Sequence, residues 1–534
     1  MWRRLWRILP AILAFSLLAV QIAIPWTVPH FVTQDGPSHL YTAVVAKNLL
    51  FHAQPYASLY RINRHLVPSW ASTILLALSA TVAGAGHAEQ LMTGLILCLG
   101  FFSFSYAIRS LSPTALRWTP LSNFLLETWF LWMGFYNFYL GIVLAPFAIG
   151  FYIRRGGRLT TRTAITLAFG VALLFFVHLL AAAVCLLALG IIALWQHVAR
   201  PALWTKSPDW PEAGRQLGIF AAAILPVVVL GLIFAHQAPA GMAFHPNVLQ
   251  SLSEFPMHVF ATAKGLGGGQ WYLFPVVLGL IVIAVLGMHR SEWHTAKGGL
   301  GVAAVALFLA YLLVPDSGLG GNVVKVRFAW IVFLLGGLLV SSVVRLQPLA
   351  TPIAIFLTAC LAFNLAVTGQ SLVDYSDAVD DYLSALSRIS PGSTIVRLRY
   401  PTPDLSQRYG FGDIGRDPLF HLDAYAASRL KCIDLTDYQA PTLDFPVIFN
   451  SKLDHEKQFE LLEFETPRED EGAVLNSLRQ DLPIPIDYVI VVADGSSPAA
   501  PVAKVITSLD SGMQLIAQSP APAFVRVYQR TAAR

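Results

Sequence analysis

The chain has 534 residues, of which 55% are hydrophobic and only 13% are charged. A water-soluble protein of this length needs more charge on its surface, so the composition excludes a purely soluble protein and predicts that most of the chain faces lipid. Before residue 370 there are 21 Lys and Arg against eight Asp and Glu, whereas the remainder has 15 against 23. The pattern predicts a basic membrane part followed by an acidic domain, and it does not indicate nucleic-acid binding.

The N-terminus begins with MWRRLWR and continues as a long apolar run. This run exceeds the usual length of about 7–15 residues for the core of a secretory signal, and no clear cleavage site follows it. We therefore expect a retained membrane anchor with its arginines in the cytoplasm.

Apolar runs long enough to approach a membrane crossing of about 20 residues recur up to residue 369. The basic clusters at 154–162, 199–206 and 289–297 are expected in the cytoplasm, which places the end of the last run outside. A cytoplasmic N-terminus and an external C-terminal part require an odd number of crossings. We expect eleven, with 68–85 or 88–108 at the interface or re-entrant. The apolar segments lie near 8–29, 68–85, 88–108, 119–134, 136–153, 163–180, 181–198, 217–236, 271–289, 299–314, 328–346 and 349–369.

The pattern changes after residue 370. PGSTIVRLRY, IDYVIVVAD, MQLIAQS and AFVRVYQR have the composition of strands, and PVAKVITSL has that of a helix. The predicted fold class is a polytopic α-helical membrane domain over 1–369, followed by a soluble extracytoplasmic α/β domain over 370–534.

Asp35 and His39 lie in TQDGPSHLYTA, directly after the predicted anchor. Gly36 and Pro37 favour a turn that starts a helix, which would put His39 one turn after Asp35 on the same face. The carboxylate suits a general base for an acceptor hydroxyl, or the pair suits a divalent cation such as Mg²⁺ or Mn²⁺. In the plainer alternative, Asp35 is an N-cap and His39 an interfacial polar residue.

Lys325 and Arg327 lie at the mouth of the apolar segment that begins at 328. Cations at an outer helix end run against the positive-inside tendency. Phosphate binding explains them, because Arg offers a fixed fork of donors; snorkelling toward lipid headgroups is the alternative. Ionisable groups beside a membrane often mark function, so further candidates for an outer cavity are His178, His258, His421 and Glu254.

Two familiar kinds of site are not predicted. The sequence has no HExxH and no paired His/Cys spacing typical of zinc sites. The glycine-rich KGLGGGQW at 264–271 lacks the order of a phosphate-binding loop, so we interpret it as a flexible turn and expect no nucleotide cofactor.

Several local strings resemble blocks found in GT-C fold membrane glycosyltransferases of bacterial type. These strings are MGFYNFYLG at 133–141, FFVHLLAA at 175–182, VPDSGLGGNVVKVRF at 314–328 and PLFHLDAYAA at 418–427. An Asp in the first external loop, a late basic residue and a C-terminal external α/β domain fit the same class. Many members carry a pair of acidic residues in the first loop, whereas this chain has Asp35 followed by His39.

The resemblance implies sugar transfer outside the cytoplasm, from a polyprenyl-phosphate sugar to a glycan, lipid or protein acceptor. Asp35 would activate the acceptor or, with His39, bind a metal, and Arg327 with Lys325 would hold the donor phosphate in the same outer pocket. The implied location is the bacterial inner membrane, with the C-terminal domain in the periplasm. The alternatives are a transporter or flippase of lipid-linked saccharides, an oligosaccharide ligase, and a non-catalytic envelope assembly protein that binds a partner.

Overall fold

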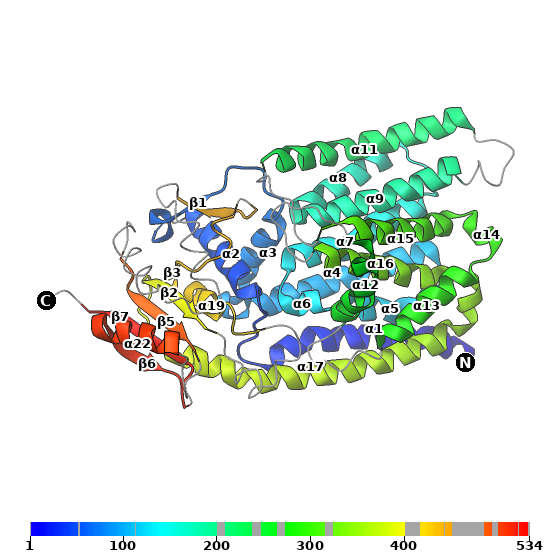
Figure 1. Ribbon diagram of the computed structural model, residues 1–534. Coiled ribbons are helices and arrows are strands. Elements are labelled where there is room, and N and C mark those ends of the chain that lie inside the picture. Colours follow the sequence, from blue (N-terminus) through cyan, green and yellow to red (C-terminus); the bar gives the residue numbers. More distant parts are fainter. Residues whose placement is uncertain are drawn as a thin grey trace. The chain divides into compact units, whose positions relative to one another are not determined.

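The chain forms two compact units (Figure 1). The computed structural model describes residues 2–51, 54–112, 114–199, 209–237, 247–263, 273–315, 324–400, 417–442, 444–450, 485–493, 500–521 and 523–531. Unit 1 comprises Met1–Ile24, Thr93–Leu131 and Phe135–Thr368, and unit 2 comprises Pro25–Met92, Trp132–Gly134 and Gly369–Arg534.

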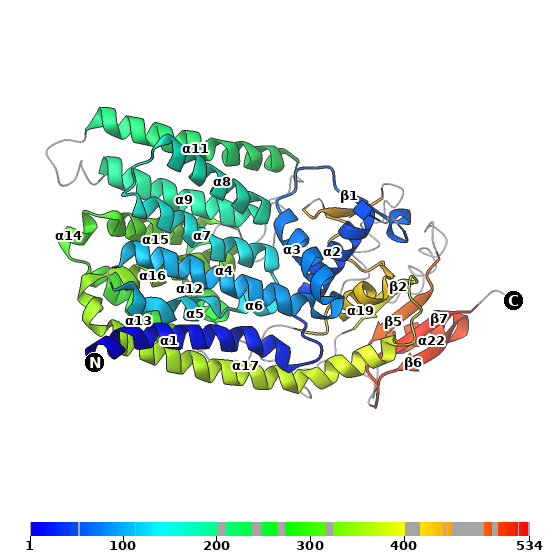
Figure 2. The same cartoon turned by 180° about the vertical axis from the view of Figure 1, so that it is seen from behind.

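Unit 1 is built from helices. In both views α8, α9 and α11 run side by side, and α15 packs on α9 and on α16 (Figures 1 and 2). Three of the helices that form unit 1, namely α4, α6 and α17, also contribute residues to unit 2. The helices are α1 (Trp2–Ala23), α4 (Ala88–Leu111), α5 (Ala115–Leu126), α6 (Trp129–Met133), α7 (Tyr136–Arg154), α8 (Thr161–Val177), α9 (Leu179–Leu194), α11 (Trp210–Gln237), α12 (Val248–Ala263), α13 (Leu273–Gly287), α14 (Arg290–Trp293), α15 (Ala296–Leu313), α16 (Val324–Ser342) and α17 (Ala350–Leu386).

Several helices of the chain have the length and composition of membrane spans. Among the described residues, eight helical segments are long and apolar enough to cross a bilayer. Large apolar side chains are exposed on their surfaces, as expected where helices face lipid rather than water; examples are Phe102, Leu225, Leu232, Leu309 and Phe363. The chain is therefore a multi-pass membrane protein, and the eleven crossings stay a prediction.

Two parts of the chain differ in detail from the expectation. The segment 119–134 is broken at Glu127 between α5 and α6, and α12 has no counterpart among the predicted apolar segments. The segment 68–85, one of the pair of which one member was not expected to cross, forms only the 14-residue α3 (Trp70–Ala83), which belongs to unit 2. Apolar composition alone did not separate these short helices from spans, because both bury the same kinds of side chain.

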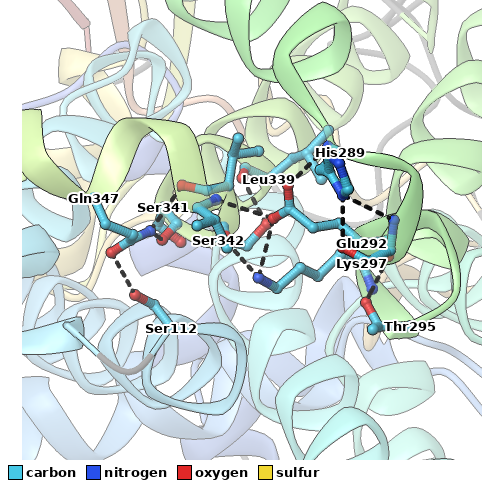
Figure 3. Close-up of polar contacts among 12 residues, drawn as sticks. Ser112, His289, Glu292, Thr295, Lys297, Leu339, Ser341, Ser342 and Gln347 are labelled. Atoms are coloured by element: carbon cyan, nitrogen blue, oxygen red, sulfur yellow. Dashed lines mark hydrogen bonds and ion pairs between the residues drawn. The ribbon is translucent and has the colours of Figure 1, made fainter.

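A cluster of polar contacts in unit 1 joins the end of α16 to α14 and α15 (Figure 3). The buried Glu292 carboxylate accepts from the Val344 N–H at 2.9 Å and pairs with Lys297 at 3.3 Å. Lys297 also donates to the Ser342 carbonyl, and the Gln347 amide donates to the Ser341 carbonyl at 2.9 Å. These bonds satisfy carbonyls that a helix end leaves without partners inside the helix.

Unit 2 contains a five-stranded sheet with the order β3-β2-β5-β7-β6. The pairs β2–β3 and β2–β5 are parallel, and β5–β7 and β6–β7 are antiparallel. Each strand predicted from the sequence is present, and so is the predicted helix. The strands are β2 (Thr394–Arg399), β3 (Ile433–Asp434), β5 (Tyr488–Val492), β6 (Met513–Gln518) and β7 (Val525–Arg530), and the helices include α19 (Leu422–Leu430) and α22 (Ala500–Gly512).

Unit 2 also includes the segment that follows the N-terminal anchor. Helix α2 (Gly36–Phe51) packs on α19, and β1 (Tyr60–Ile62) pairs antiparallel with β4 (Val447–Phe449). The buried tyrosines Tyr41 and Tyr60 bind the backbone of the β3 region: the Asp434 N–H donates to the Tyr41 hydroxyl at 2.8 Å, and the Tyr60 hydroxyl donates to the Asp434 carbonyl. Residues almost 400 positions apart thus share one core.

Candidate functional site

Asp35 occupies the position just before α2, which begins at Gly36 as the sequence predicts. Its carbonyl accepts the His39 N–H at 3.1 Å, and its own N–H donates to the Met133 carbonyl at 2.9 Å. Its backbone therefore starts the helix, as in the N-cap alternative. Its side chain, 15% exposed, approaches His421, with 3.9 Å between Oδ1 and Nε2.

Two glycines fix the bend that presents Asp35. Gly134 has φ of +77°, and a Cβ there would lie 2.2 Å from Thr33 Oγ1 and 2.5 Å from the Gly36 nitrogen. A Cβ on Gly36 would lie 2.0 Å from Glu89 Oε2. The buried Glu89 carboxylate accepts from the Thr33 hydroxyl at 2.9 Å. Three separate segments of unit 2 thus meet with no room for a side chain.

His421 lies just before α19 among rings and paired charges. Its imidazole stacks on Tyr438 with centroids 4.8 Å apart, and it meets the edge of Phe420 at 4.5 Å. Burial, and then the charges of Arg397 and Arg399, lower the pKa of His421 well below 6.5. The imidazole is therefore neutral at neutral pH. Its 3.9 Å contact with Asp35 is not an ion pair under those conditions, and it is longer than a hydrogen bond.

The two arginines of this cluster come from alternate positions of β2 and so share one face of the sheet. Arg397 pairs with Asp423 at 3.0 Å, with both side chains buried, and Arg399 pairs with Asp417. Both guanidinium groups also lie over the Phe420 ring, at 5.4 and 4.6 Å from its centroid. Each positive charge here is thus matched by a carboxylate.

His39 is held by Gln439, which in turn binds Thr42. The Gln439 amide nitrogen lies 2.9 Å from His39 Nδ1, and the Gln439 amide oxygen accepts from the Thr42 hydroxyl at 2.6 Å. Because an amide NH₂ only donates, His39 Nδ1 must be the acceptor. Burial lowers the pKa of His39 to about 4, so this ring is neutral at physiological pH.

The predicted metal pair of Asp35 and His39 is not supported by this arrangement. The lone pair of His39 Nδ1 already accepts a hydrogen bond, and within the described ranges no group of three His, Cys, Asp or Glu could hold an ion. The residues present do not fit a metal site, and the divalent cation stays a prediction from the sequence.

Asp437 is a buried carboxyl in contact with α2, and the sequence interpretation did not select it as a candidate. Its Oδ1 accepts from the Gln439 N–H at 3.1 Å and lies 3.5 Å from the Ser38 hydroxyl on α2. Its side chain is buried, and among the described residues no donor reaches Oδ2. Burial raises the pKa of Asp437 to about 7. The polar run DLTDYQ at 434–439 was the available signal.

In unit 1, Arg327 and His178 both contact Phe138. The Arg327 guanidinium lies 5.0 Å from the centroid of the Phe138 ring and 5.2 Å from that of Phe135. The His178 ring meets Phe138 edge-on at 5.4 Å, and His178 Nδ1 accepts from the Leu180 N–H, which caps α9. These aromatic faces hold a cation and an imidazole in one part of unit 1.

The remaining candidates have separate settings. Lys325 Nζ donates to the Ser251 hydroxyl on α12 at 2.9 Å, and Glu254 accepts from Gln250 at 2.7 Å on the same helix. His258 falls within α12, but its side chain lies outside the described residues. Asp35 and Arg327 belong to different units, so their shared pocket stays a prediction.

Comparison with solved structures shows the fold. The chain matches ArnT from Cupriavidus metallidurans in the apo state with a TM-score of 0.54 and 11% identity, covering 96% of this chain and 97% of that one. It matches ArnT bound to undecaprenyl phosphate with a TM-score of 0.50 and 12% identity, covering 99% and 98%. The Archaeoglobus fulgidus oligosaccharyltransferase in complex with Zn and sulfate gives 0.44 and 11%, covering 91% and 68%. No protein-family model and no curated protein matches the chain.

These similarities extend over nearly the whole length of ArnT and this chain. The GT-C fold implied by the sequence resemblance is therefore confirmed. At 11–12% identity the likeness concerns the fold alone, so the roles of individual residues rest on the geometry above.

Gly134→Ala should destabilise unit 2. The added Cβ meets Thr33 and Gly36, and alanine tolerates φ of +77° poorly, so we expect a loss of about 2 kcal/mol or more and a lower Tm. Gly170→Ala in α8 is the matched control, because no described atom lies within 4 Å of its Cβ position. Equal thermal unfolding of the two variants would contradict the tight bend.

The buried Asp437 carboxyl should make stability depend on pH. Because burial raises its pKa from 3.8 to about 7, its contribution is fully present below about pH 4 and is lost as the pH rises through 7. Asp437→Asn removes this titration. The stability of the wild type relative to Asp437→Asn, measured as the difference in Tm, should therefore decrease as the pH is raised from 4 to 8. The decrease corresponds to up to about 4 kcal/mol in the free energy of unfolding. A difference that does not change with pH would argue against the buried carboxyl.

Proposed function

We propose that the chain is a glycosyltransferase of the bacterial inner membrane. It transfers a sugar from a polyprenyl-phosphate donor to a hydroxyl of a glycan, lipid or protein acceptor on the extracytoplasmic side. The observation that carries the proposal is the setting of Asp35, a partly exposed carboxylate at a rigid bend beside a neutral imidazole. The GT-C fold supports it, since ArnT with the same fold is described as bound to undecaprenyl phosphate.

Asp35 acts as the general base in this reaction. The acceptor oxygen attacks the anomeric carbon of the donor sugar while the bond from that carbon to the phosphate oxygen breaks. The acceptor proton moves to the Asp35 carboxylate, and the electron pair of the broken bond stays on the phosphate. His421, neutral and held by its stacking on Tyr438, fixes the surroundings of the Asp35 carboxylate without neutralising its charge.

Arg327 has the role of holding the donor phosphate. The leaving phosphate gains negative charge as the bond breaks, and a positioned guanidinium stabilises that charge by two parallel hydrogen bonds. The rings of Phe135 and Phe138 hold the guanidinium in place. Lys325, two residues earlier and bound to Ser251, adds positive charge on the same helix.

Asp35→Asn should abolish transfer while leaving the protein folded and inserted. The amide keeps the shape of the side chain and removes the base, so we expect a loss of roughly 10²–10⁴-fold in transfer rate. The readouts are the surface polysaccharide profile of a complemented deletion strain and sugar transfer by membranes. Asp444→Asn makes the same change at a half-buried carboxyl elsewhere in unit 2 and should behave like the wild type. Normal glycan from Asp35→Asn would remove Asp35 from the mechanism.

Arg327→Ala should weaken the binding of a lipid phosphate. A lost charge-assisted hydrogen bond of about 1.5–3 kcal/mol corresponds to roughly 10- to 150-fold in Kd for undecaprenyl phosphate in nanodiscs. Arg327→Lys keeps the charge without the fork and should fall in between. Arg345→Ala alters an exposed arginine after α16 and is the control. An unchanged Kd for Arg327→Ala would favour the snorkelling alternative.

A further inference from the structure

Polar side chains on one face of α2 contact the turn at 437–439. Asp35, Ser38, His39 and Thr42 follow the helical spacing of three and four, so their side chains lie along one face. Ser38 contacts Asp437, and His39 and Thr42 both bind Gln439. The turn is therefore fixed against the helix that Asp35 begins.

Asp437 has an oxygen that these contacts do not use. A carboxylate accepts up to four hydrogen bonds, and the described residues supply donors only to Oδ1. Leaving a buried acceptor without a donor costs about 1–3 kcal/mol, and more when it is charged. A raised pKa, caused mainly by burial, agrees with an environment that lacks donors. A ligand hydroxyl would supply the missing donor.

The charge around Asp437 selects against an anion. Arg397 and Arg399 are already matched by Asp423 and Asp417. Because burial lowers the pKa of both His39 and His421, neither histidine adds positive charge at neutral pH. The Asp35 carboxylate, together with the fraction of Asp437 that is ionised near pH 7, leaves this cluster acidic, which disfavours a phosphate or carboxylate ligand.

Aromatic rings lie beside the two carboxylates. The half-buried Tyr438 stacks on His421, whose Nε2 approaches Asp35, and Tyr438 meets the Phe445 ring at 6.5 Å. Phe445 in turn lies 5.8 Å from the His39 ring. A few polar acceptors set among aromatic side chains form a typical site for a ligand that has both hydroxyls and an apolar face.

From these contacts we infer that Asp437 is the hydroxyl-binding carboxylate of a sugar site in unit 2, and that its ligand is an uncharged, hydroxyl-rich saccharide. Asp437 Oδ2 accepts from one sugar hydroxyl and orients the ring. That the saccharide is the acceptor, with Asp35 facing the hydroxyl that receives the transferred sugar, rests on the proposed function. Asp437 is thus a binding and positioning residue.

The test measures sugar binding by the full chain in nanodiscs with saturation-transfer NMR. The probes are methyl glycosides of glucose, galactose and mannose, with glucose 6-phosphate as the anionic probe. We expect wild type to bind at least one methyl glycoside and to prefer it to the phosphate. Asp437→Asn should weaken that binding about tenfold or more. Asp374→Asn, at an exposed carboxyl on α17 in unit 2, is the control and should leave it unchanged.

Several outcomes overturn the inference. These are no binding of any methyl glycoside by wild type, tighter binding of glucose 6-phosphate, and equal binding by Asp437→Asn and wild type. If Asp437→Asn does not fold, Ser38→Ala replaces it, because the Ser38 hydroxyl contacts the same carboxylate. That variant should bind the glycoside about threefold more weakly, and unchanged binding overturns the inference as well.

Asp35→Asn separates this inference from the proposed function. It should lose transfer but keep glycoside binding within about threefold, because Asp35 takes up the acceptor proton in the proposed reaction, whereas Asp437 makes the hydrogen bond that orients the ring. If Asp35→Asn loses transfer but Asp437→Asn binds the glycoside as wild type does, the result contradicts the sugar site alone. If Asp35→Asn retains transfer but Asp437→Asn binds more weakly, the result contradicts the proposed base and supports the sugar site.

Discussion

Unit 2 depends on the contact between the polar face of α2 and the segment 432–439. Tyr41 and Thr42 on the helix bind Asp434 and Gln439, and neither bond is exposed to competing water. In a buried setting each such bond is costly to break, because the groups left behind cannot be solvated. The position of Asp35, which precedes this helix by one residue, follows from these bonds.

The same contact decides which groups near Asp35 carry charge. Burial makes both histidines neutral, and salt bridges pair the charges of Arg397 and Arg399, which act on His421. An adjacent unmatched cation would stabilise the ionised form of a carboxylate and make it a weaker base. Acid–base chemistry on a hydroxyl is therefore favoured where cations are paired, whereas phosphate binding is favoured by a cation that can face the ligand. In the proposed function, unit 2 supplies the first condition, and the arginine and lysine at the start of α16 in unit 1 supply the second.

Much of the fold could be predicted from the sequence, because apolar runs and alternating strands report directly on burial. The strands around Val396 and Val489 and the helix at 500–512 were predicted for this reason. The pairing of β1 with β4 was not, since a three-residue strand has no period to detect and its partner lies almost 390 residues away. The boundary at 369 matched a change of composition but passes through the continuous helix α17.

The candidate site was predicted in part. Asp35 and His421 were selected for their residue types and for the turn after Asp35, and the structure brings their side chains together. His39 was assigned to a metal because its spacing from Asp35 suited one, but spacing does not reveal that Gln439 occupies its nitrogen. Asp437 was missed because an acidic residue in a polar run resembles ordinary surface until the burial of its neighbours is known.

The interleaving of the units in the sequence has a consequence for biogenesis. Residues 25–92 are synthesised early. Their partners are β4, which pairs with β1, and β3, whose Asp434 binds Tyr41. Both strands are synthesised only after the helices of unit 1. Until then Tyr41, Tyr60 and the polar face of α2 lack their partners, and closing so long a loop is slow. A chain truncated before residue 430 would thus leave the early residues of unit 2 without their partners, and an unfolded segment of this kind is a target for proteases.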